Sequence, residues 1–431
     1  MDFPDFILTH DGDDLGRLAL SRERHHAQVE DFDLALTTLE VRRKLRGKAP
    51  SWYAEPSLRY PIRLSGEQCS SEETARYKAS VARAAVDESP AAVADLTGGL
   101  GVDSWAFAQL FDRVLYNEMQ PALADAAAFN FRELELENVL VRHDELRPGN
   151  LTQVLDGFQP DLLFLDPARR SSDGRKVFRL EDCRPDVLQL LPELLEACPL
   201  VLLKLSPMAD ITLACKQLAC VKEAHVVAAE GECKELLLLL ERGWGGPYSV
   251  TVYENGAVAE VSGEEGDIPR SVATLGRVRG RGPSEMGGVA KRRSGDITLF
   301  SGMSLFEPGK ALLKAGAFDW PCGFGLTKLG RHTHLYTAPG PVSALAPFGK
   351  WFRILETVPL NNKSIKEMGK RYPGADVTAR NIPLTSEDLR AKLAKHASSP
   401  AEKAPDGPLH IFGVRIDSLQ ANYLLVCARQ D

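Results

Sequence analysis

Paired cysteines, long apolar runs and an export-type leader are all missing from this chain of 431 residues. Its eight cysteines are scattered without a C-x-x-C pair, so we expect neither a disulfide framework nor a zinc knuckle. No window approaches the roughly 18 uninterrupted apolar residues of a membrane-spanning helix. The N-terminus also lacks a basic region followed by an apolar core. These absences predict a globular cytoplasmic protein with reduced thiols and no metal site.

The formal net charge of −7 hides a division along the chain. Residues 1–244 hold 28 Lys and Arg against 41 Asp and Glu (−13), whereas residues 245–431 hold 24 against 18 (+6). A basic appendage on an acidic part fits a module that approaches phosphate groups. Chance segregation of solvated charge explains the same counts equally well.

The length predicts two to four domains, and an apolar content of 44% can fill ordinary cores. Residues 1–88 read as a helical N-terminal region, with a helix over 33–45 and a second one that opens at Ser70, where Glu73 completes a capping box. Over 89–243, apolar strands alternate with helices, which is typical of a parallel sheet with helices on both faces. Seven strands are expected there, at 92–96, 114–117, 139–142, 162–166, 200–205, 224–228 and 235–240.

The segment Gly243–Pro247 interrupts this alternation and marks the next boundary. We expect a small α+β domain over 244–343 and a second α+β domain over 344–431. The second one reads strand, helix, strand, helix, strand, with 423–427 as a closing strand. The stretch 398–407, rich in Ala, Pro and Lys, is expected to be a mobile loop.

The first expected strand runs through Asp95 into a Thr-Gly-Gly-Leu-Gly turn and then a helix. Gly98, Gly99 and Gly101 can adopt the backbone angles of a tight turn and leave room for a ligand. Glu118 closes the next strand, where a carboxylate suits a ribose diol. The glycine spacing differs from the dinucleotide fingerprint and resembles motif I of class I S-adenosylmethionine-dependent methyltransferases.

Two further elements follow in register. The third strand ends at Asp144, where an acid can accept a hydrogen bond from an adenine amino group. The fourth leads into Asp166-Pro167-Ala168-Arg169, which resembles motif IV of nucleic-acid methyltransferases. All four elements end strands at the carboxyl edge, where open α/β sheets bind ligands. Taken singly, each also fits an ordinary glycine-rich or Asp-Pro turn.

Methyl transfer from a sulfonium depends mostly on positioning in a dry pocket. Asp166 and the stiffened carbonyl of Pro167 could orient, and partly deprotonate, an attacking nitrogen or hydroxyl. Ala168 stands where base N-methyltransferases carry an aromatic residue that stacks on the flipped base. This difference weakens the prediction that the enzyme methylates an exocyclic amino group. Asp-Pro-Ala-Arg is nearer the D-P-P-R of uridine C5-methyltransferases, but the Lys204–Met208 segment after the fifth strand has no cysteine, which disfavours covalent chemistry.

Basic and polar side chains supply candidate substrate-binding groups. Lys204 and Ser206 could line the target site, although a lysine that closes a strand is equally often a solvated end. A glycine-arginine stretch suits a phosphate-contacting loop, with a disordered solvated loop as its equal competitor. The candidates are Arg169, Lys204, Ser206, Arg277, Arg279, Arg281, Arg292 and Arg293, with Lys291 in the same basic cluster.

His332 and His334 lie two residues apart, which would place both rings on one face of a strand. With no third ligand nearby, a packed or RNA-facing pair is favoured over a metal site.

Seven segments look like signatures of one family: Gln68–Lys78, Asp95–Asp103, Leu165–Arg170, Lys204–Met208, Ala315–Phe318, Thr333–Tyr336 and Ala379–Leu384. They resemble the bacterial class I methyltransferases that carry a C-terminal THUMP-like domain. The resemblance implies a helical N-terminal part, a Rossmann-like α/β catalytic domain, a ferredoxin-like domain and a THUMP-like end. Because authentic THUMP domains present RNA to tRNA-modifying enzymes, the resemblance also implies an RNA substrate.

These observations predict an S-adenosylmethionine-dependent methyltransferase for RNA, with tRNA or rRNA preferred. The expected site is Asp95, Thr97, Gly98, Gly99, Gly101, Glu118 and Asp144 for the cofactor, with Asp166 and Pro167 as catalytic residues. One alternative is a methyltransferase of a protein or small metabolite, whose C-terminal half dimerises or forms a lid. Another is a non-catalytic RNA-binding or scaffold protein that retains the fold.

Overall fold

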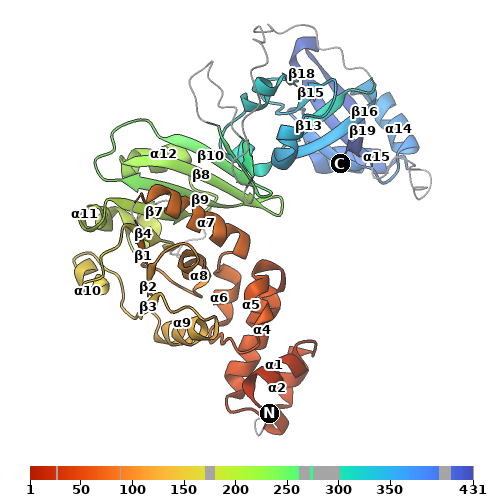
Figure 1. Ribbon diagram of the computed structural model, residues 1–431. Helices are drawn as coiled ribbons and strands as arrows, with labels where there is room; N and C mark the ends of the chain where they lie inside the picture. Colours follow the sequence, from red (N-terminus) through yellow and green to blue (C-terminus); the bar gives the residue numbers. More distant parts are fainter. Residues whose placement is uncertain are drawn as a thin grey trace. The chain divides into compact units, whose positions relative to one another are not determined.

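The structure is a computed structural model that describes residues 1–25, 28–87, 89–169, 180–261, 272–274, 301–397 and 409–430. The chain forms two compact units, one of residues 1–229 and 234–249 and the other of residues 230–233 and 250–431. Figure 1 shows the helices and strands of both units. The finer division into four domains, at 1–88, 89–243, 244–343 and 344–431, stays a prediction.

Among the described residues of the first unit, seven strands lie side by side in the order β3-β2-β1-β4-β7-β9-β8. Strands β1 to β4 and β7 are parallel, and β9 runs antiparallel to β7. A two-residue turn joins β8 to β9. The strands span Ala92–Asp95 (β1), Arg113–Asn117 (β2), Val139–Arg142 (β3), Leu162–Leu165 (β4), Leu200–Leu205 (β7), Val221–Ala229 (β8) and Glu232–Glu241 (β9). The Rossmann-like sheet expected from the alternation of strands and helices is confirmed.

Helices cover this sheet on both sides, and Figure 1 shows α8 and α9 on one side and α10 and α11 on the other. Strands β1 and β4 are buried along their whole length, as expected for parallel strands enclosed by helices. A proline stands in the first turn of α9, where its missing N–H leaves no unmet bond. The helices span Val102–Ala108 (α8), Pro121–Glu133 (α9), Leu151–Leu155 (α10), Val187–Ala197 (α11) and Ile211–Leu218 (α12).

In the described part of residues 1–91, seven helices precede the sheet: Phe3–His10 (α1), Leu15–Leu20 (α2), Arg22–His25 (α3), Phe32–Lys48 (α4), Pro50–Ala54 (α5), Arg63–Gln68 (α6) and Glu72–Ala85 (α7). The basic end of α4 is used inside the protein. Arg43 donates to the carbonyls of His10 and Asp11 at 3.1 and 2.9 Å, and the buried Arg42 lies 4.4 Å from the ring of Tyr53. These two arginines therefore stabilise the helical region.

The start of α7 differs from the expectation by one residue. Ser71 is the N-cap, because its hydroxyl accepts the backbone N–H of Thr74 at 3.2 Å. The predicted cap, Ser70, instead donates its hydroxyl to Asp103 at 2.8 Å. Adjacent serines are equivalent cap candidates in sequence, and the carboxylate of Asp103 decides which one is free to cap.

The second unit contains a hairpin and a mostly antiparallel sheet with the order β14-β15-β13-β16-β19-β18-β17. Only β17 and β18 are parallel among its described strand pairs. The hairpin is Ser249–Glu254 (β10) and Ala257–Glu260 (β11), with Val272–Thr274 (β12) against β11. The sheet strands span Ser304–Pro308 (β13), Thr327–Lys328 (β14), Tyr336–Ala338 (β15), Gly349–Pro359 (β16), Asp376–Arg380 (β17), Leu409–Ile416 (β18) and Ala421–Gln430 (β19). The closing strand expected at 423–427 lies within β19, whereas the stretch 398–407 lies outside the described residues.

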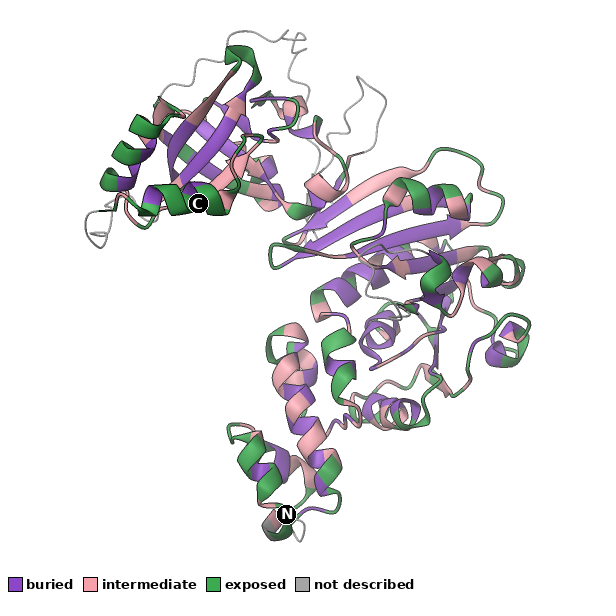
Figure 2. Cartoon of the chain, turned by 180° about the vertical axis from the view of Figure 1, so that it is seen from behind, coloured by how far each residue is buried: buried purple, intermediate pink, exposed green. Residues whose placement is uncertain are grey.

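Two amphipathic helices cover part of this second sheet: Asn362–Arg371 (α14) and Ser386–Ala394 (α15). Their apolar residues Ile365, Met368 and Leu389 join a core with the sheet residues Ile411 and Val426. The outward faces of both helices are exposed (Figure 2). A shorter helix, Lys310–Lys314 (α13), follows β13.

The histidine pair does not lie on a strand, so that expectation is wrong. His334 has a left-handed φ of 49° and stacks on Phe318 with the ring centroids 4.0 Å apart, whereas His332 is exposed in a turn. Within the described ranges no cluster of His, Cys, Asp or Glu could hold a metal ion. No helix of the described chain is long and apolar enough to cross a membrane.

Candidate functional site

The turn after β1 is held by Asp95, which is 1% exposed. One carboxylate oxygen accepts the backbone N–H of Thr97 at 3.1 Å, and the other accepts the hydroxyl of Ser104, in α8, at 2.6 Å. Burial raises the pKa of Asp95 from 3.8 to about 7, while the hydrogen bond from Ser104 lowers it. Both oxygens therefore fix the shape of the turn.

The glycines of the turn are required for different reasons. A Cβ on Gly98 would lie 2.1 Å from the ring of Tyr116, whose hydroxyl donates to the carbonyl of Gly99 at 2.5 Å. Gly99 and Gly101 have φ angles of 54° and 96°, in the region that disfavours other residues. A Cβ on Gly99 would meet nothing closer than 4.0 Å. The turn therefore packs tightly against the protein at Gly98 and is open beside Gly99.

Glu118 follows β2 and faces this turn. Its carboxylate accepts the backbone N–H of Gly99 at 2.9 Å and that of Gln120, also at 2.9 Å, and the residue is 7% exposed. Each carboxylate oxygen has further lone pairs and can accept an additional hydrogen bond. Glu118 is thus pre-oriented by two backbone donors and keeps acceptor capacity for a ligand hydroxyl.

Asp144 is placed by the buried side chain of Asn117, at the end of β2. The Asn117 amide accepts the N–H of Asp144 at 3.0 Å and donates to its carbonyl at 3.0 Å, and it also donates to the carbonyl of Leu96 at 3.3 Å. Asn117 therefore ties the chain after β3 to the ends of β1 and β2. The structure brings Asp144 to the same sheet edge as Glu118.

Asp166 follows β4 and adjoins the glycine turn. Its backbone N–H donates to the hydroxyl of Thr97 at 2.6 Å, and its carboxylate forms an ion pair with Lys204, the fifth residue of β7. The Asp166 side chain is 34% exposed, against 12% for Lys204. The pair offers a partly accessible acceptor next to a cationic donor.

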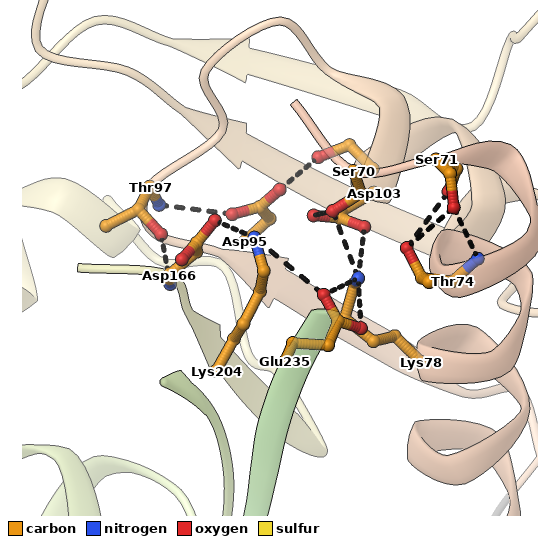
Figure 3. A network of polar contacts seen from close by, with 11 residues as sticks. Ser70, Ser71, Thr74, Lys78, Asp95, Thr97, Asp103, Asp166, Lys204 and Glu235 are labelled. Carbon is orange, nitrogen blue, oxygen red and sulfur yellow. Dashed lines mark hydrogen bonds and ion pairs between the residues drawn. The ribbon is translucent and has the colours of Figure 1, made fainter. Parts of the chain in front are cut away.

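A chain of buried charges continues from Lys204 into the protein (Figure 3). The Lys204 ammonium lies 3.9 Å from Glu235 of β9, and Glu235 accepts two bonds, at 2.8 and 2.9 Å, from the fully buried Lys78 of α7. Lys78 also contacts Asp103 at 3.2 Å and donates to Ser70 at 3.0 Å. Helix α7 is thereby linked to the carboxylate of Asp166 through alternating charges.

The electrostatics of this network keep Lys204 charged. Burial lowers the pKa of Lys204, but the carboxylates of Asp166, Glu235 and Asp103 outweigh burial and raise the pKa above its ordinary value. Burial raises the pKa of Glu235, and Lys78 and Lys204 oppose that effect. The ammonium of Lys204 is therefore a permanent donor beside Asp166.

For several other residues predicted from the sequence, the structure gives a position but no contact that points to a substrate. Ser206 is half-buried in the loop after β7, where its hydroxyl accepts the N–H of Met208 at 3.2 Å. Pro167 is buried, and the backbone of Arg169 lies in the short strand Ala168–Arg169 (β5), which pairs with Cys183–Arg184 (β6). The basic cluster Arg277, Arg279, Arg281, Lys291, Arg292 and Arg293 lies outside the described residues.

Sequence reasoning missed the residues that support the site from a distance: Ser70, Lys78, Ser104, Tyr116, Asn117 and Glu235. A polar residue at the end of an apolar strand was a signal for Asn117. Lys78 and Glu235 each have apolar neighbours in the sequence. They are 157 residues apart, so no local pattern predicts that they form an ion pair.

None of the eight cysteines forms a disulfide bond in the described part of the chain. Burial raises the pKa of the Cys69 thiol, although Lys48 and Lys204 act to lower it. A thiol with a raised pKa is a poor nucleophile at neutral pH. Cys69, which adjoins the Ser70 end of the network, therefore lacks the activation that covalent catalysis needs.

The first unit, with its glycine turn and acids at the carboxyl edge of the sheet, has a methyltransferase fold. Family models match a ferredoxin-like domain over residues 305–344 and a THUMP domain-like region over residues 349–429. A "putative methyltransferase" from Porphyromonas gingivalis W83 is 30% identical, with a TM-score of 0.73, and the match covers 100% of this chain and 98% of that one. The chain belongs to the same family as this Porphyromonas gingivalis protein.

Several further solved structures match about two fifths of the chain. A "putative RNA methyltransferase" from Pyrococcus horikoshii is 14% identical over 39% of this chain and 84% of that one, with a TM-score of 0.30. An rRNA methylase from Streptococcus thermophilus is also 14% identical, over 39% and 95%, with a TM-score of 0.27. At this level the matches say nothing of the substrate. Comparison with curated proteins gives no significant match.

Proposed function

We propose that this protein is an S-adenosylmethionine-dependent methyltransferase that modifies RNA by direct methyl transfer. The observation that carries the proposal is the convergence of the glycine turn, Glu118 and Asp166 at one sheet edge, where Gly99 of the turn bonds to Glu118 and Thr97 bonds to Asp166. Open α/β sheets bind ligands at this edge. Membership of the family of a methyltransferase-like protein supports the same activity.

The residues present fit this cofactor. The open space beside Gly99 lets the backbone approach a ligand closely, and Glu118 keeps lone pairs for the two hydroxyls of a ribose. Asp144 would accept a hydrogen bond from the adenine amino group. Asp95 would support the cofactor indirectly by fixing the shape of the turn, because both of its carboxylate oxygens already accept hydrogen bonds from Thr97 and Ser104.

When bound, the cofactor supplies a methyl group on a positively charged sulfur. The role of Asp166 is to orient the acceptor nitrogen or hydroxyl and to accept its proton or a hydrogen bond. Its ion pair with Lys204 keeps the carboxylate in one place, while the 34% exposure of its side chain leaves room for an acceptor. Lys204 can donate to a second polar atom of the same acceptor. No cysteine nucleophile is involved, in keeping with the raised pKa of Cys69.

The RNA part of the proposal is supported by the THUMP domain-like match over residues 349–429. The excess of basic residues in the second part of the chain is favourable for a polyanionic substrate. A protein or metabolite substrate would need neither feature.

Calorimetric titration with S-adenosylhomocysteine tests the cofactor assignment. We expect the wild-type protein to bind, and Glu118→Gln to bind about 10- to 100-fold more weakly, because a charged hydrogen bond contributes about 1.5–3 kcal/mol. Glu133→Gln, on the exposed end of α9, is the matched control and should bind normally. Absence of binding by the wild-type protein would refute the assignment.

Mass spectrometry of RNA nucleosides tests the substrate class. Cells that lack the gene should lose one methylated nucleoside, and the wild-type gene should restore it while an Asp166→Asn gene should not. Identical nucleoside profiles with and without the gene would refute an RNA substrate and favour a protein or metabolite.

A further inference from the structure

Helix α14 in the second unit presents basic side chains to solvent. Its buried residues are Ile365, Met368 and Gly369, which pack inward. A Cβ on Gly369 would lie 2.3 Å from the carbonyl oxygen of Leu393, so α14 approaches the end of α15 very closely. This packing fixes which face of α14 points outward.

Three lysines occupy that outward face: Lys363, Lys366 and Lys370. At about 100° per residue they fall within about 60° of the helix circumference, and they extend over about 10 Å of its axis. All three are exposed, and none forms an ion pair with a residue in the described part of the chain. Held together on a rigid helix, the three ammonium groups are mutually repulsive unless an anion lies against them.

The exposed face of α14 does not suit a membrane surface. A helix that lies on a bilayer needs apolar side chains to insert, but Ile365 and Met368 are buried against the sheet. Glu367, which is also exposed, borders the lysines on one side and would weaken adsorption to any large flat anionic surface. A narrow row of cations suits a linear polyanion better.

We propose that the α14 stripe, defined as Lys363, Lys366 and Lys370, binds the phosphate backbone of the RNA substrate. Its length of about 10 Å corresponds to about three phosphate-to-phosphate steps along one strand of a duplex, at about 3.4 Å per step. Such contacts position a nucleic acid without reading its sequence. This inference rests on the proposed RNA-directed function and assigns the docking surface to the second unit.

The test measures RNA affinity of the full chain by fluorescence anisotropy, with a labelled tRNA pool as probe, at several salt concentrations. The variant is Lys363→Gln/Lys366→Gln/Lys370→Gln, since glutamine retains helix propensity. The matched control removes three exposed lysines elsewhere, as Lys216→Gln/Lys310→Gln/Lys350→Gln. Titration with S-adenosylhomocysteine checks that both variants keep the wild-type cofactor affinity.

We expect the stripe variant to reduce the slope of log K against log salt by about 2 to 3, because each of the three lost phosphate contacts removes about 0.7 for a single strand and about 0.9 for a duplex. If these contacts contribute nothing at 1 M salt, the affinity at 0.15 M falls by about 50- to 150-fold. The control should stay close to wild type.

Wild-type RNA binding with an unchanged slope in the stripe variant would overturn the docking surface and leave the proposed function standing. No RNA binding by the wild-type protein, despite normal cofactor binding, would overturn both the surface and the RNA substrate. Stronger binding to phosphatidylserine vesicles than to RNA, lost in the stripe variant, would show that the stripe serves a membrane instead.

Discussion

Replacing Lys78 by Met should strongly destabilise the first unit. The Lys78 ammonium is fully buried and lies 2.8 and 2.9 Å from the two oxygens of Glu235. Unit charges about 3 Å apart attract by about 5 kcal/mol at an effective dielectric constant of about 20. After the substitution, Lys204, at 3.9 Å, is the cation that Glu235 retains among the described residues. Breaking a buried ion pair on one side typically costs about 3–5 kcal/mol, which is the loss we expect.

This loss can be measured by urea titration read by hydrogen-exchange mass spectrometry, on peptides from α7 and β9, so that the first unit is followed separately. With an m-value of about 2 kcal/mol/M, the midpoint should fall by about 1.5–2.5 M. Lys216→Met, on the exposed end of α12, is the control and should shift the midpoint little.

The double variant Lys78→Met/Glu235→Leu protects the test against simple failure to fold. The double variant leaves no unpaired Glu235, while Asp103 loses its contact with Lys78 in both variants, so the double variant should be more stable than Lys78→Met alone. An effect of Lys78→Met no larger than that of Lys216→Met would refute the energetic importance of the network. Strict additivity of the two single substitutions would refute the direct coupling.

Two further predictions concern the glycine turn. Gly98→Ala should lower thermal stability and S-adenosylhomocysteine affinity more than Gly99→Ala does. The new Cβ at position 98 would lie 2.1 Å from the ring of Tyr116, whereas Gly99→Ala adds only about 1–2 kcal/mol of left-handed strain. Equal effects of the two substitutions in thermal-shift assays would contradict this prediction. For Asp95, burial raises the folded-state pKa from 3.8 to about 7, so the folded protein holds a proton that the unfolded chain releases, and stability falls as pH rises between these values. Asp95→Asn should remove this loss of folding stability, which amounts to at most about 4 kcal/mol. Urea titrations at pH 5 and pH 8 measure it. The same change in stability in the wild-type protein and in Asp95→Asn would refute the raised pKa of Asp95.

Much of the architecture could be predicted from local patterns. The expected strands 139–142 and 200–205 agree with β3 and β7 residue for residue. Both strands are short apolar runs between polar or helical segments. Strand β7 is mostly buried, whereas β3, at the edge of the sheet, is half-buried with Leu140 exposed. Expectations based on a single local choice failed more readily, as with the cap at Ser70 and the strand at the histidine pair.

The site was predictable only where chemistry coincides with the end of a strand. Asp95, Glu118, Asp144 and Asp166 each follow an apolar run, so a parallel sheet must bring them to one edge. Their roles in cofactor binding and catalysis stay predictions. The residues that support these acids could not be predicted. Tyr116, for example, packs on Gly98 through a side-chain contact that the strand pattern does not encode.

By itself, the sequence determined the alternation of strands and helices and the row of acids at the carboxyl edge, since both follow from hydrophobic periodicity along neighbouring residues. Only the tertiary structure decided that Lys204 pairs with Asp166 and that Lys78 and Glu235 meet in the interior, 157 residues apart. The physical reason is that a buried charge is tolerated only beside its partner. The packing of α7 against the sheet places Lys78 next to Glu235. A local run of residues carries no information about that contact.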